Sequence, residues 1–201
     1  MSSTAHAAKD RPARGGARDA ILAATLEVIA QHGLDAVTHR RVADLAGVSP
    51  GSTTYHFASR EELIRAAFAF YMSMADRFVS TLDRALRASI VDPAERVREI
   101  LCGLVAEEFA DDRQVRAEYE MILFASKDHE LGSFLRQWET RWVGHIATDL
   151  EEAGAERAVE TARILINVTR GYELERLTNS ELGVEDLRRR LQTVLSCLLD
   201  R

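Results

Sequence analysis

The sequence predicts an all-α protein of nine helices, with a small N-terminal three-helix module followed by a larger helical bundle. Apolar residues recur at intervals of three and four through most of the 201 residues, which is the spacing of one helix face. No stretch alternates apolar and polar residues between turn signals, as a strand would. Only Pro12, Pro50 and Pro93 interrupt the chain, so long segments are free to be helical.

Composition excludes several classes of protein. With 46% hydrophobic and 29% charged residues, the chain is typical of a globular domain and too apolar to be disordered. Cys102 and Cys197 stand alone, which excludes a disulfide framework and a zinc knuckle. No run approaches the ~18 apolar residues of a membrane span, and the N-terminus lacks the hydrophobic run of a signal peptide. We therefore expect a cytoplasmic protein that does not contact the membrane.

The N-terminal segment changes character near residue 17. Residues 1–16 mix Pro, Gly, Ala, Ser and Arg without a period, which predicts a flexible basic arm. From Arg18 the apolar residues follow a helical period up to His32. Gly33 then stands where a left-handed C-terminal cap belongs, so we expect the first helix to end there.

Capping residues mark the starts of the following helices. Three of these helices are preceded by a residue with a side-chain hydroxyl. Thr38 stands alone, Ser49 is followed by Pro50, and Ser59 is followed three residues later by Glu62. The same arrangement of a capping residue followed by proline occurs at Asp92-Pro93. Beyond the three helices before residue 58, we expect helices at 60–90, 93–110, 112–126, 129–153, 156–178 and 184–200. These give two domains after the arm, at 17–62 and 63–201.

Charge is divided unevenly between the two parts of the chain. The net charge is −6, but residues 1–60 sum to +2 and residues 61–201 to −8. Such asymmetry permits an N-terminal module that meets an anion such as DNA, beside a larger acidic module that does not.

The segment from Thr38 to Leu63 contains the most informative pattern. Two short helices are predicted on either side of Ala46-Gly47-Val48-Ser49. Gly47 permits a sharp turn, and Val48 can pack the second helix against the first. This is the geometry of a helix-turn-helix, whose second helix lies in the DNA major groove. A plain helical hairpin is the alternative interpretation.

This segment resembles the TetR/AcrR family of bacterial transcription regulators. The matching residues are Ile21-Leu22-Ala23-Ala24, Gly33, Thr38, Arg40, Val42-Ala43, Ala46-Gly47-Val48-Ser49, Gly51, Tyr55-His56-Phe57 and Arg60-Glu61-Glu62-Leu63. The resemblance implies a homodimer that binds a palindromic double-stranded DNA operator, usually as a repressor released by a small molecule. Thr53 and Thr54 depart from the pattern, because the family often has a bulky apolar residue followed by tyrosine there.

The candidate DNA-binding residues lie in and around the two short helices. They are Thr38, Arg40, Ser49, Gly51, Ser52, Thr53, Thr54, Tyr55, His56 and Arg60. Arg40 suits a guanine edge or a phosphate, and small hydroxyls such as Ser52 and Thr53 suit base edges. The resemblance implies phosphate contacts for Thr38, Tyr55 and His56. Ser49 at a helix N-terminus and Arg60 are further phosphate candidates.

Nearby residues receive other interpretations. Arg41 is expected to be solvated or ion-paired, and Phe57 to lie in the core. Arg11, Arg14 and Arg18 suit the minor groove, although a disordered tail explains them equally well.

Aromatic and polar residues of the larger module suggest a pocket for an effector. Trp138, Trp142 and His145 fall on one helical stripe. The full candidate set is Tyr119, Met121, Phe124, Trp138, Trp142, His145, Asn167 and Arg170, with ordinary core packing and helix-pairing hydrogen bonds as the alternative. The acidic balance favours a neutral or cationic ligand, which a local arginine such as Arg170 could reverse.

The last helix carries an apolar seam. Leu187, Leu191, Val194 and Leu198 follow each other at steps of four, three and four. With Ile164, Val168 and Gly171 on the preceding helix, they predict an intersubunit four-helix bundle. A core within one protomer is the alternative.

Enzymatic chemistry is not indicated. None of the six histidines has glutamate three residues before it, which a di-iron bundle would need, and no phosphate-binding loop or Gly-x-Ser-x-Gly elbow occurs. We expect no cofactor and no metal. A DNA-binding architectural protein without an effector remains the rival to a ligand-responsive regulator.

Overall fold

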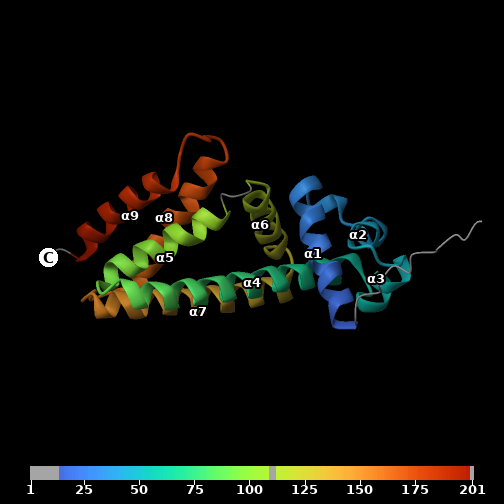
Figure 1. Ribbon diagram of the computed structural model, residues 1–201, viewed down its shortest axis with the longest axis horizontal. Coiled ribbons are helices and arrows are strands. Elements are labelled where there is room, and N and C mark those ends of the chain that lie inside the picture. The colour runs from blue at the N-terminus through green and yellow to red at the C-terminus, as the bar shows by residue number, and fades with distance from the viewer. Residues whose placement is uncertain (1–13, 109–111, 200–201) are drawn as a thin grey trace, which may run out of the picture. The chain divides into compact units, whose positions relative to one another are not determined.

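The computed structural model describes residues 14–108 and 112–199, and within these ranges it confirms an all-α fold of nine α-helices without strands (Figure 1). The helices are α1 (Arg14–His32), α2 (His39–Ala46), α3 (Pro50–His56), α4 (Arg60–Ser89), α5 (Pro93–Glu108), α6 (Asp112–Ala125), α7 (His129–Glu152), α8 (Ala158–Arg176) and α9 (Val184–Leu199). A 3-10 turn, Leu34–Ala36, follows α1. The chain divides into two compact units between Tyr71 and Met72, inside α4.

The helix bounds differ from the expected ones mainly at the N-terminus. α1 begins at Arg14, so the last residues of the predicted arm are helical, because the first turn of a helix needs no apolar residue. Arg11 lies outside the described residues. The unit boundary also falls later than the predicted division at residues 62 and 63, because Leu63, Ile64, Ala67 and Phe68 are buried near the start of α4.

Local capping explains where the N-terminal helices start and stop. Gly33 and Gly47 follow α1 and α2 with positive φ values of 80° and 66°. Gly47 has the left-handed conformation of a C-cap, whereas Gly33, with a ψ of 167°, does not, so the left-handed cap predicted at Gly33 is wrong. The Thr38 hydroxyl accepts a hydrogen bond from the Arg41 backbone N–H at 3.2 Å, which confirms the predicted N-cap of α2.

The cap of α4 is also confirmed, whereas that of α3 is only partly so. Ser59 Oγ accepts from the Glu62 N–H at 3.0 Å, and the Glu62 carboxylate accepts from the Ala58 N–H at 2.7 Å. Ser49 occupies the N-cap position of α3, but its side chain forms no capping hydrogen bond, so that part of the prediction is wrong. Pro50 at the first turn starts this helix instead.

The N-terminal unit is built around one apolar core. Its helix α1 packs against α2 and α3, and α2 packs against α3. The buried side chains include Ile21, Leu22, Val28, Ile29, Val37, Val42, Phe57, Leu63 and Ile64. Burial of these residues from every element of the unit holds the two short helices in place, since neither is long enough to be stable alone.

The C-terminal unit has a larger core in which α7 packs against α8, and α5 packs against α7 and α9. Leu187, Leu191 and Leu195 of α9 are buried in this core. The prediction that Leu187 and Leu191 form the dimer interface is therefore wrong. Apolar residues at steps of four and three give the same sequence pattern whether they pack within their own protomer or against a second one.

An ion pair reinforces the contact between α9 and α5. Arg188 donates to both carboxylate oxygens of Glu99, at 2.9 and 2.7 Å. These hydrogen bonds lower the pKa of Glu99 and raise that of Arg188. The pair thus adds a polar contact to the apolar packing of α9 against α5.

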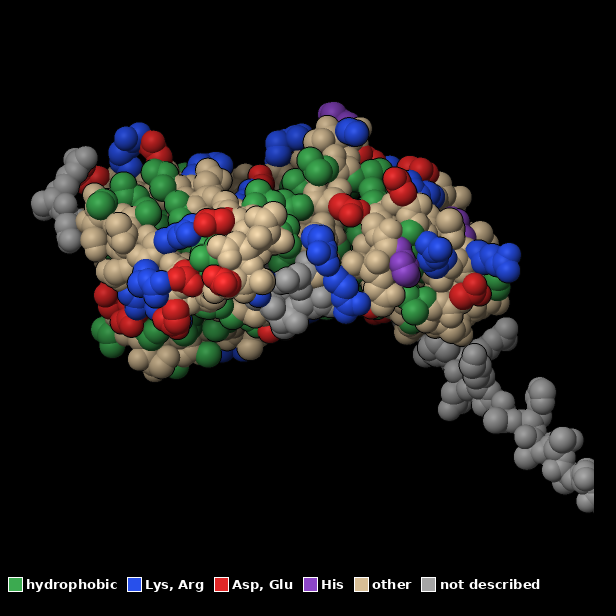
Figure 2. Space-filling model, turned by 90° about the horizontal axis from the view of Figure 1, so that it is seen from above, with side chains coloured by type: hydrophobic (Ala, Val, Ile, Leu, Met, Phe, Trp, Pro, Cys, Tyr) green, Lys and Arg blue, Asp and Glu red, His purple; other side chains and the backbone are tan. Residues whose placement is uncertain are grey.

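The surface of the protein is mixed. On the face that Figure 2 shows, apolar side chains lie among acidic and basic ones. The exposed large apolar residues of the C-terminal unit include Leu123, Val159, Ile164 and Leu174. No helix in the described ranges is long and apolar enough to cross a membrane.

Candidate nucleic-acid interface and effector site

The N-terminal unit presents α2 and α3 as a helix-turn-helix. The two helices contact each other and are joined by the left-handed turn at Gly47. The Val48 backbone N–H donates to the Ala43 carbonyl at 3.1 Å, which ties the turn back onto α2. The geometry predicted for residues 38–63 is thus present.

One face of α3 is buried in the unit. Thr53 is fully buried, and its hydroxyl lies 2.8 Å from the Pro50 carbonyl and 3.4 Å from that of His39 in α2. Phe57, which directly follows α3, is buried as expected. The prediction that Thr53 contacts a base edge is wrong, because its hydroxyl holds α3 against α2.

The other face of α3 is exposed. Gly51 and Thr54 are exposed, Ser52 and His56 are half-buried, and Tyr55 is 80% exposed. The Tyr55 and His56 rings meet edge to face with centroids 5.2 Å apart. A tyrosine this exposed contributes little to the unit's own core, and an aromatic ring with a hydroxyl suits contact with a phosphate backbone.

Two adjacent arginines at the start of α2 differ in their surroundings. Arg40 is exposed and forms no hydrogen bond or ion pair with any described residue. Arg41 is also exposed, but its guanidinium donates to the Ala36 carbonyl at 3.2 Å. Arg40 is therefore the arginine available to a ligand, while Arg41 supports the turn before α2.

Arg60 at the start of α4 is used within the unit. Its guanidinium donates to the carbonyls of Leu34 and Val37, at 2.8 and 3.1 Å, and lies 3.6 Å from Asp35. The predicted phosphate contact is not supported, because Nε and one terminal nitrogen of the guanidinium bind the 3-10 turn and the other terminal nitrogen lies 3.7 Å from Glu61. Arg18, a candidate for the minor groove, lies over the Phe57 ring, 5.6 Å from its centroid.

The two threonines of α3 allow a matched test of this arrangement. We expect Thr53→Val to lower the free energy of unfolding by about 1–2 kcal/mol, because it removes a buried hydroxyl that is hydrogen-bonded to backbone carbonyls. Thr54→Val removes an exposed hydroxyl and should cost less than about 0.5 kcal/mol. Urea unfolding of both variants measures the difference, and equal losses would contradict the inward placement of Thr53.

In the C-terminal unit, three of the predicted effector residues line one hollow. Trp142 of α7 and Asn167 and Arg170 of α8 surround a volume of about 140 Å³. Glu139, Val143, Arg163 and Ile166 complete the lining, and none of these four was predicted from the sequence. Arg163, Asn167 and Arg170 follow each other at steps of four and three, which is a signal that could have found Arg163.

The hollow combines an aromatic wall with a basic rim. Arg170 and Glu139 form an ion pair at 2.8 Å. Arg163 is exposed and forms no ion pair or hydrogen bond within the described part of the chain. One positive charge is thus left over at the rim, beside the Trp142 indole.

The other predicted pocket residues do not line this hollow. The Tyr119 hydroxyl donates to Glu173 at 2.7 Å, and burial, followed by the Glu173 charge, raises the pKa of Tyr119 far above its usual value. Met121 is buried and Phe124 half-buried on α6. Trp138 and His145 contact α4 instead, through Asp76 and Asp83. The single helical stripe concealed that these aromatic residues of α7 face two different neighbours.

Comparison with known proteins identifies the family. Residues 21–67 match the model of bacterial regulatory proteins of the tetR family, and residues 92–201 match that of the tetracyclin repressor-like C-terminal domain. A comparison with curated protein sequences found no match.

Solved structures are similar over almost the whole chain. A transcriptional regulator from Rhodococcus sp. Rha1 aligns with a TM-score of 0.80 at 22% identity, covering 91% of this chain and 96% of the other. A TetR-family member from Streptomyces coelicolor A3 aligns at 0.64 and 30% identity, covering 91% and 98%. The multidrug binding protein EbrR, complexed with ethidium, aligns at 0.63 and 30% identity, covering 89% and 97%. With its helix-turn-helix and matches in both units, this chain belongs to the TetR family of transcriptional regulators, DNA-binding proteins that are not enzymes.

Proposed function

We propose that this regulator binds an inverted-repeat DNA operator as a homodimer and leaves it when a small molecule binds the C-terminal unit. The observation that carries the proposal is the division of α3 into a buried face anchored by Thr53 and an outer face that exposes Tyr55. A helix anchored on one side and exposed on the other can enter a major groove without disturbing the unit that holds it.

The proposed DNA contacts are the candidate residues of α2, of α3 and of their N-cap positions that are exposed or half-buried. Arg40 at the start of α2 reads a guanine edge or binds a phosphate, and the outer residues of α3 meet the groove and its backbone. The proposed set is Thr38, Arg40, Ser49, Gly51, Ser52, Thr54, Tyr55 and His56. Thr53 and Arg60 are left out because their polar groups bind carbonyls within the unit.

The proposed dimer interface is the α8–α9 face, which comprises Ile164, Val168 and Gly171 of α8 with Val194 and Leu198 of α9. Ile164 is 39% exposed, and Gly171 is exposed with no atom within 4 Å of the position a Cβ would take. Val168, Val194 and Leu198 are half-buried, and Val168 and Val194 also pack against the protomer's own core. A partly exposed apolar stripe that ends in a small residue lets a second helix approach closely. A two-fold dimer would place two α3 helices on half-sites about one DNA turn, ~34–36 Å, apart.

The hollow between α7 and α8 is the proposed effector site. Its volume of about 140 Å³ is close to the roughly 150 Å³ of a cavity that holds benzene, so it accepts one aromatic ring. The Trp142 wall and the unpaired charge of Arg163 favour an aromatic acid, because guanidinium binds carboxylate with two parallel hydrogen bonds. This reverses the charge preference expected from overall composition. The similarity to EbrR, which was solved with ethidium and with imidazole, supports binding of a small ring compound.

Tryptophan emission tests the effector site. Both tryptophans, Trp138 and Trp142, lie in α7, so emission reports on the C-terminal unit alone. We expect benzoate to change the emission with the same midpoint at which it releases DNA, since ligand and DNA binding are linked. Trp142→Phe should abolish most of the signal, and Arg163→Gln should raise the midpoint for benzoate about tenfold.

Imidazole is the matched probe without a carboxylate. A response to imidazole but not to benzoate would contradict the proposed charge preference. Release of DNA by benzoate without any change in emission would place the effector elsewhere.

DNA binding itself is tested by selection from a random-sequence duplex library with the purified protein. We expect enrichment of one inverted repeat, because each protomer presents the same helix to one half-site. Enrichment of a site without internal symmetry would contradict the proposed dimer, and no enrichment at all would contradict specific DNA binding.

A further inference from the structure

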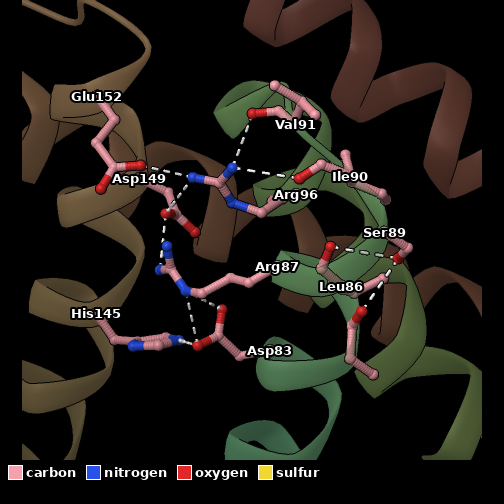
Figure 3. A network of polar contacts seen from close by, with 11 residues as sticks. Asp83, Leu86, Arg87, Ser89, Ile90, Val91, Arg96, His145, Asp149 and Glu152 are labelled. Carbon is pink, nitrogen blue, oxygen red and sulfur yellow. Dashed lines mark hydrogen bonds and ion pairs between the residues drawn. The ribbon is translucent and has the colours of Figure 1, made fainter.

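Helices α4 and α7 are joined by polar contacts in a constant register. Trp138 Nε1 donates to Asp76 Oδ1 at 2.8 Å, His145 Nε2 lies 3.9 Å from Asp83 Oδ2, and Arg87 lies 2.7 Å from Asp149. The two residues of every pair are 62 positions apart in the sequence. We call these three contacts the α4–α7 ladder, and Figure 3 shows its middle and lower pairs.

The spacing along each helix explains why the ladder is specific for one register. The residues follow each other at steps of seven and then four on both helices, so they lie along one stripe of each. The constant offset means that α4 and α7 run in the same direction at the ladder. A displacement of α4 by one turn would therefore break all three contacts together, whereas apolar side chains could repack. Polar pairs at helix contacts are known to select one register in this way.

The lower end of the ladder is anchored in the core. The Asp149 side chain is only 1% exposed and accepts from Arg87 of α4 and, at 3.0 Å, from Arg96 of α5. Arg96 also donates to the carbonyls of Ile90 and Val91 (Figure 3). The end of α4, the turn that follows it, α5 and α7 are thus held at one point, because a buried carboxylate needs its cations.

The upper end of the ladder is weaker. Asp76 is about half exposed, and its contacts are one hydrogen bond from Trp138 and a distant approach of Arg141 at 4.0 Å. Asp76 is also the ladder residue nearest in sequence to the unit boundary at Met72. The ladder therefore weakens toward the part of α4 that leads into the DNA-binding unit.

The middle contact shares a side chain with the effector hollow. The His145 ring stacks on Trp142, with centroids 5.8 Å apart, and Trp142 lines the hollow. The middle pair is a close approach and not a hydrogen bond, since His145 Nε2 has no hydrogen-bond partner among the described residues and Asp83 accepts from Arg87 of α4 at 3.1 Å. A molecule that displaces the indole would move His145 away from Asp83. This path connects the hollow to α4 without any rearrangement of the apolar core.

From these contacts we infer that the α4–α7 ladder fixes the register of α4, and that Asp76 and Asp83 are positioning residues through which the C-terminal unit sets operator affinity. The inference rests on the proposed function, because it states that the protein binds its operator only when α4 is in one register against α7. When the ladder opens, only a fraction of molecules is competent to bind, and the apparent Kd rises by the inverse of that fraction.

Two substitutions at Asp76 form a matched pair. Asp76→Asn keeps an oxygen that accepts from Trp138 Nε1, whereas Asp76→Leu removes it. Trp138→Phe removes the donor from the other side and keeps an aromatic ring. Because Asp76 is half exposed, these variants should fold, which circular dichroism verifies. We expect Asp76→Leu and Trp138→Phe to raise the operator Kd three- to tenfold and Asp76→Asn to leave it unchanged.

A distance measurement without DNA separates the ladder from the proposed function. Nitroxide labels are attached to Ala85→Cys of α4 and Gly144→Cys of α7, both within the C-terminal unit, in a Cys197→Ser background, with labelled chains diluted into unlabelled protein. Both positions are exposed, and burial raises the pKa of the remaining Cys102 thiol to about 11, so it stays unlabelled. We expect one narrow distance distribution for the ladder-intact protein and for Asp76→Asn, and a broad one for Asp76→Leu and Trp138→Phe.

The combined variant gives the decisive comparison. If Asp76 and Trp138 act through their mutual hydrogen bond, Asp76→Leu with Trp138→Phe should broaden the distances no more than either change alone. A narrow, unchanged distribution in Asp76→Leu would overturn the inference, as would equal broadening in Asp76→Asn. Broad distances with an unchanged operator Kd would show that α4 register does not set affinity. Failure of the parent protein to bind any selected DNA would refute the proposed function, while the distance distributions would still decide whether the ladder fixes the register of α4.

Discussion

Gly171→Arg should convert the regulator into a monomer and raise its operator Kd by about 10²- to 10⁴-fold. Gly171 lies in the proposed α8–α9 interface, is exposed, and has no atom within 4 Å of a Cβ built there, apart from its chain neighbours and the backbone of its own helix. An arginine at this position would leave the protomer intact and keep a second helix from approaching. Loss of the dimer removes the linkage between two half-site contacts, which accounts for the size of the effect.

Gly144→Arg is the matched control for this substitution. Gly144 of α7 is also exposed, and a Cβ there also meets nothing within 4 Å. Both changes replace a helical glycine with the same residue, so their effects on helix propensity should be equal. Sedimentation velocity should show a monomer for Gly171→Arg and a dimer for Gly144→Arg. A dimer in both variants would place the interface elsewhere.

Arg40→Ala should raise the operator Kd by roughly 10- to 100-fold, whereas Arg41→Ala should change it much less. The two side chains are adjacent and chemically identical, but Arg41 donates to the Ala36 carbonyl while Arg40 has no partner among the described residues. A bidentate contact to guanine contributes about 1–3 kcal/mol of discrimination, so its loss also relaxes the preference at one base pair.

Single-base variants of the selected site distinguish the two roles of Arg40. A lost preference at one position indicates a base contact, while uniform weakening with a reduced salt dependence indicates a phosphate contact. His56→Ala, at a proposed phosphate contact, should weaken all sequences about equally. A larger loss in Arg41→Ala than in Arg40→Ala would contradict the proposed interface.

Much of the fold could be predicted from the sequence because the signals are local. Thr38, Ser59 and Glu62 act as caps within four residues of their partners, and Gly33 and Gly47 end their helices by their own backbone conformation. Each of these signals is readable in a short window of sequence, which is why the helix bounds agree closely with those predicted.

The functional sites were predicted less well because their contacts join distant residues. Thr53 binds the carbonyl of His39, and Arg60 binds those of Leu34 and Val37, so the surface role expected of each was replaced by an internal one. No periodicity distinguishes these cases in advance. Tyr55 is likewise exposed rather than buried, although it is, with His56, one of the two aromatic residues of α3.

The dimer interface predicted from the apolar seam of α9 and the single pocket predicted from the aromatic stripe of α7 were wrong for a related reason. A stripe of Leu187 and Leu191 fits a partner helix or the protomer's own core equally well, and only the packing of α9 against α5 decides between them. On α7, Trp138 and Trp142 are one turn apart, yet Trp138 binds α4 and Trp142 lines the hollow with α8. Which helix each of these side chains contacts depends on how the helices are arranged in space, and this arrangement could not be read from the sequence.

Hydroxyl-radical footprinting of the protein on its selected DNA tests the central claim most directly. A homodimer that inserts one α3 per half-site should protect two symmetrically related patches whose centres lie about one helical turn, ~34–36 Å, apart. Arg40→Ala should weaken both patches together, and benzoate should remove both at the same concentration. A single unsymmetrical patch, or two patches that disappear independently, would contradict a two-fold regulator that reads its operator through α2 and α3.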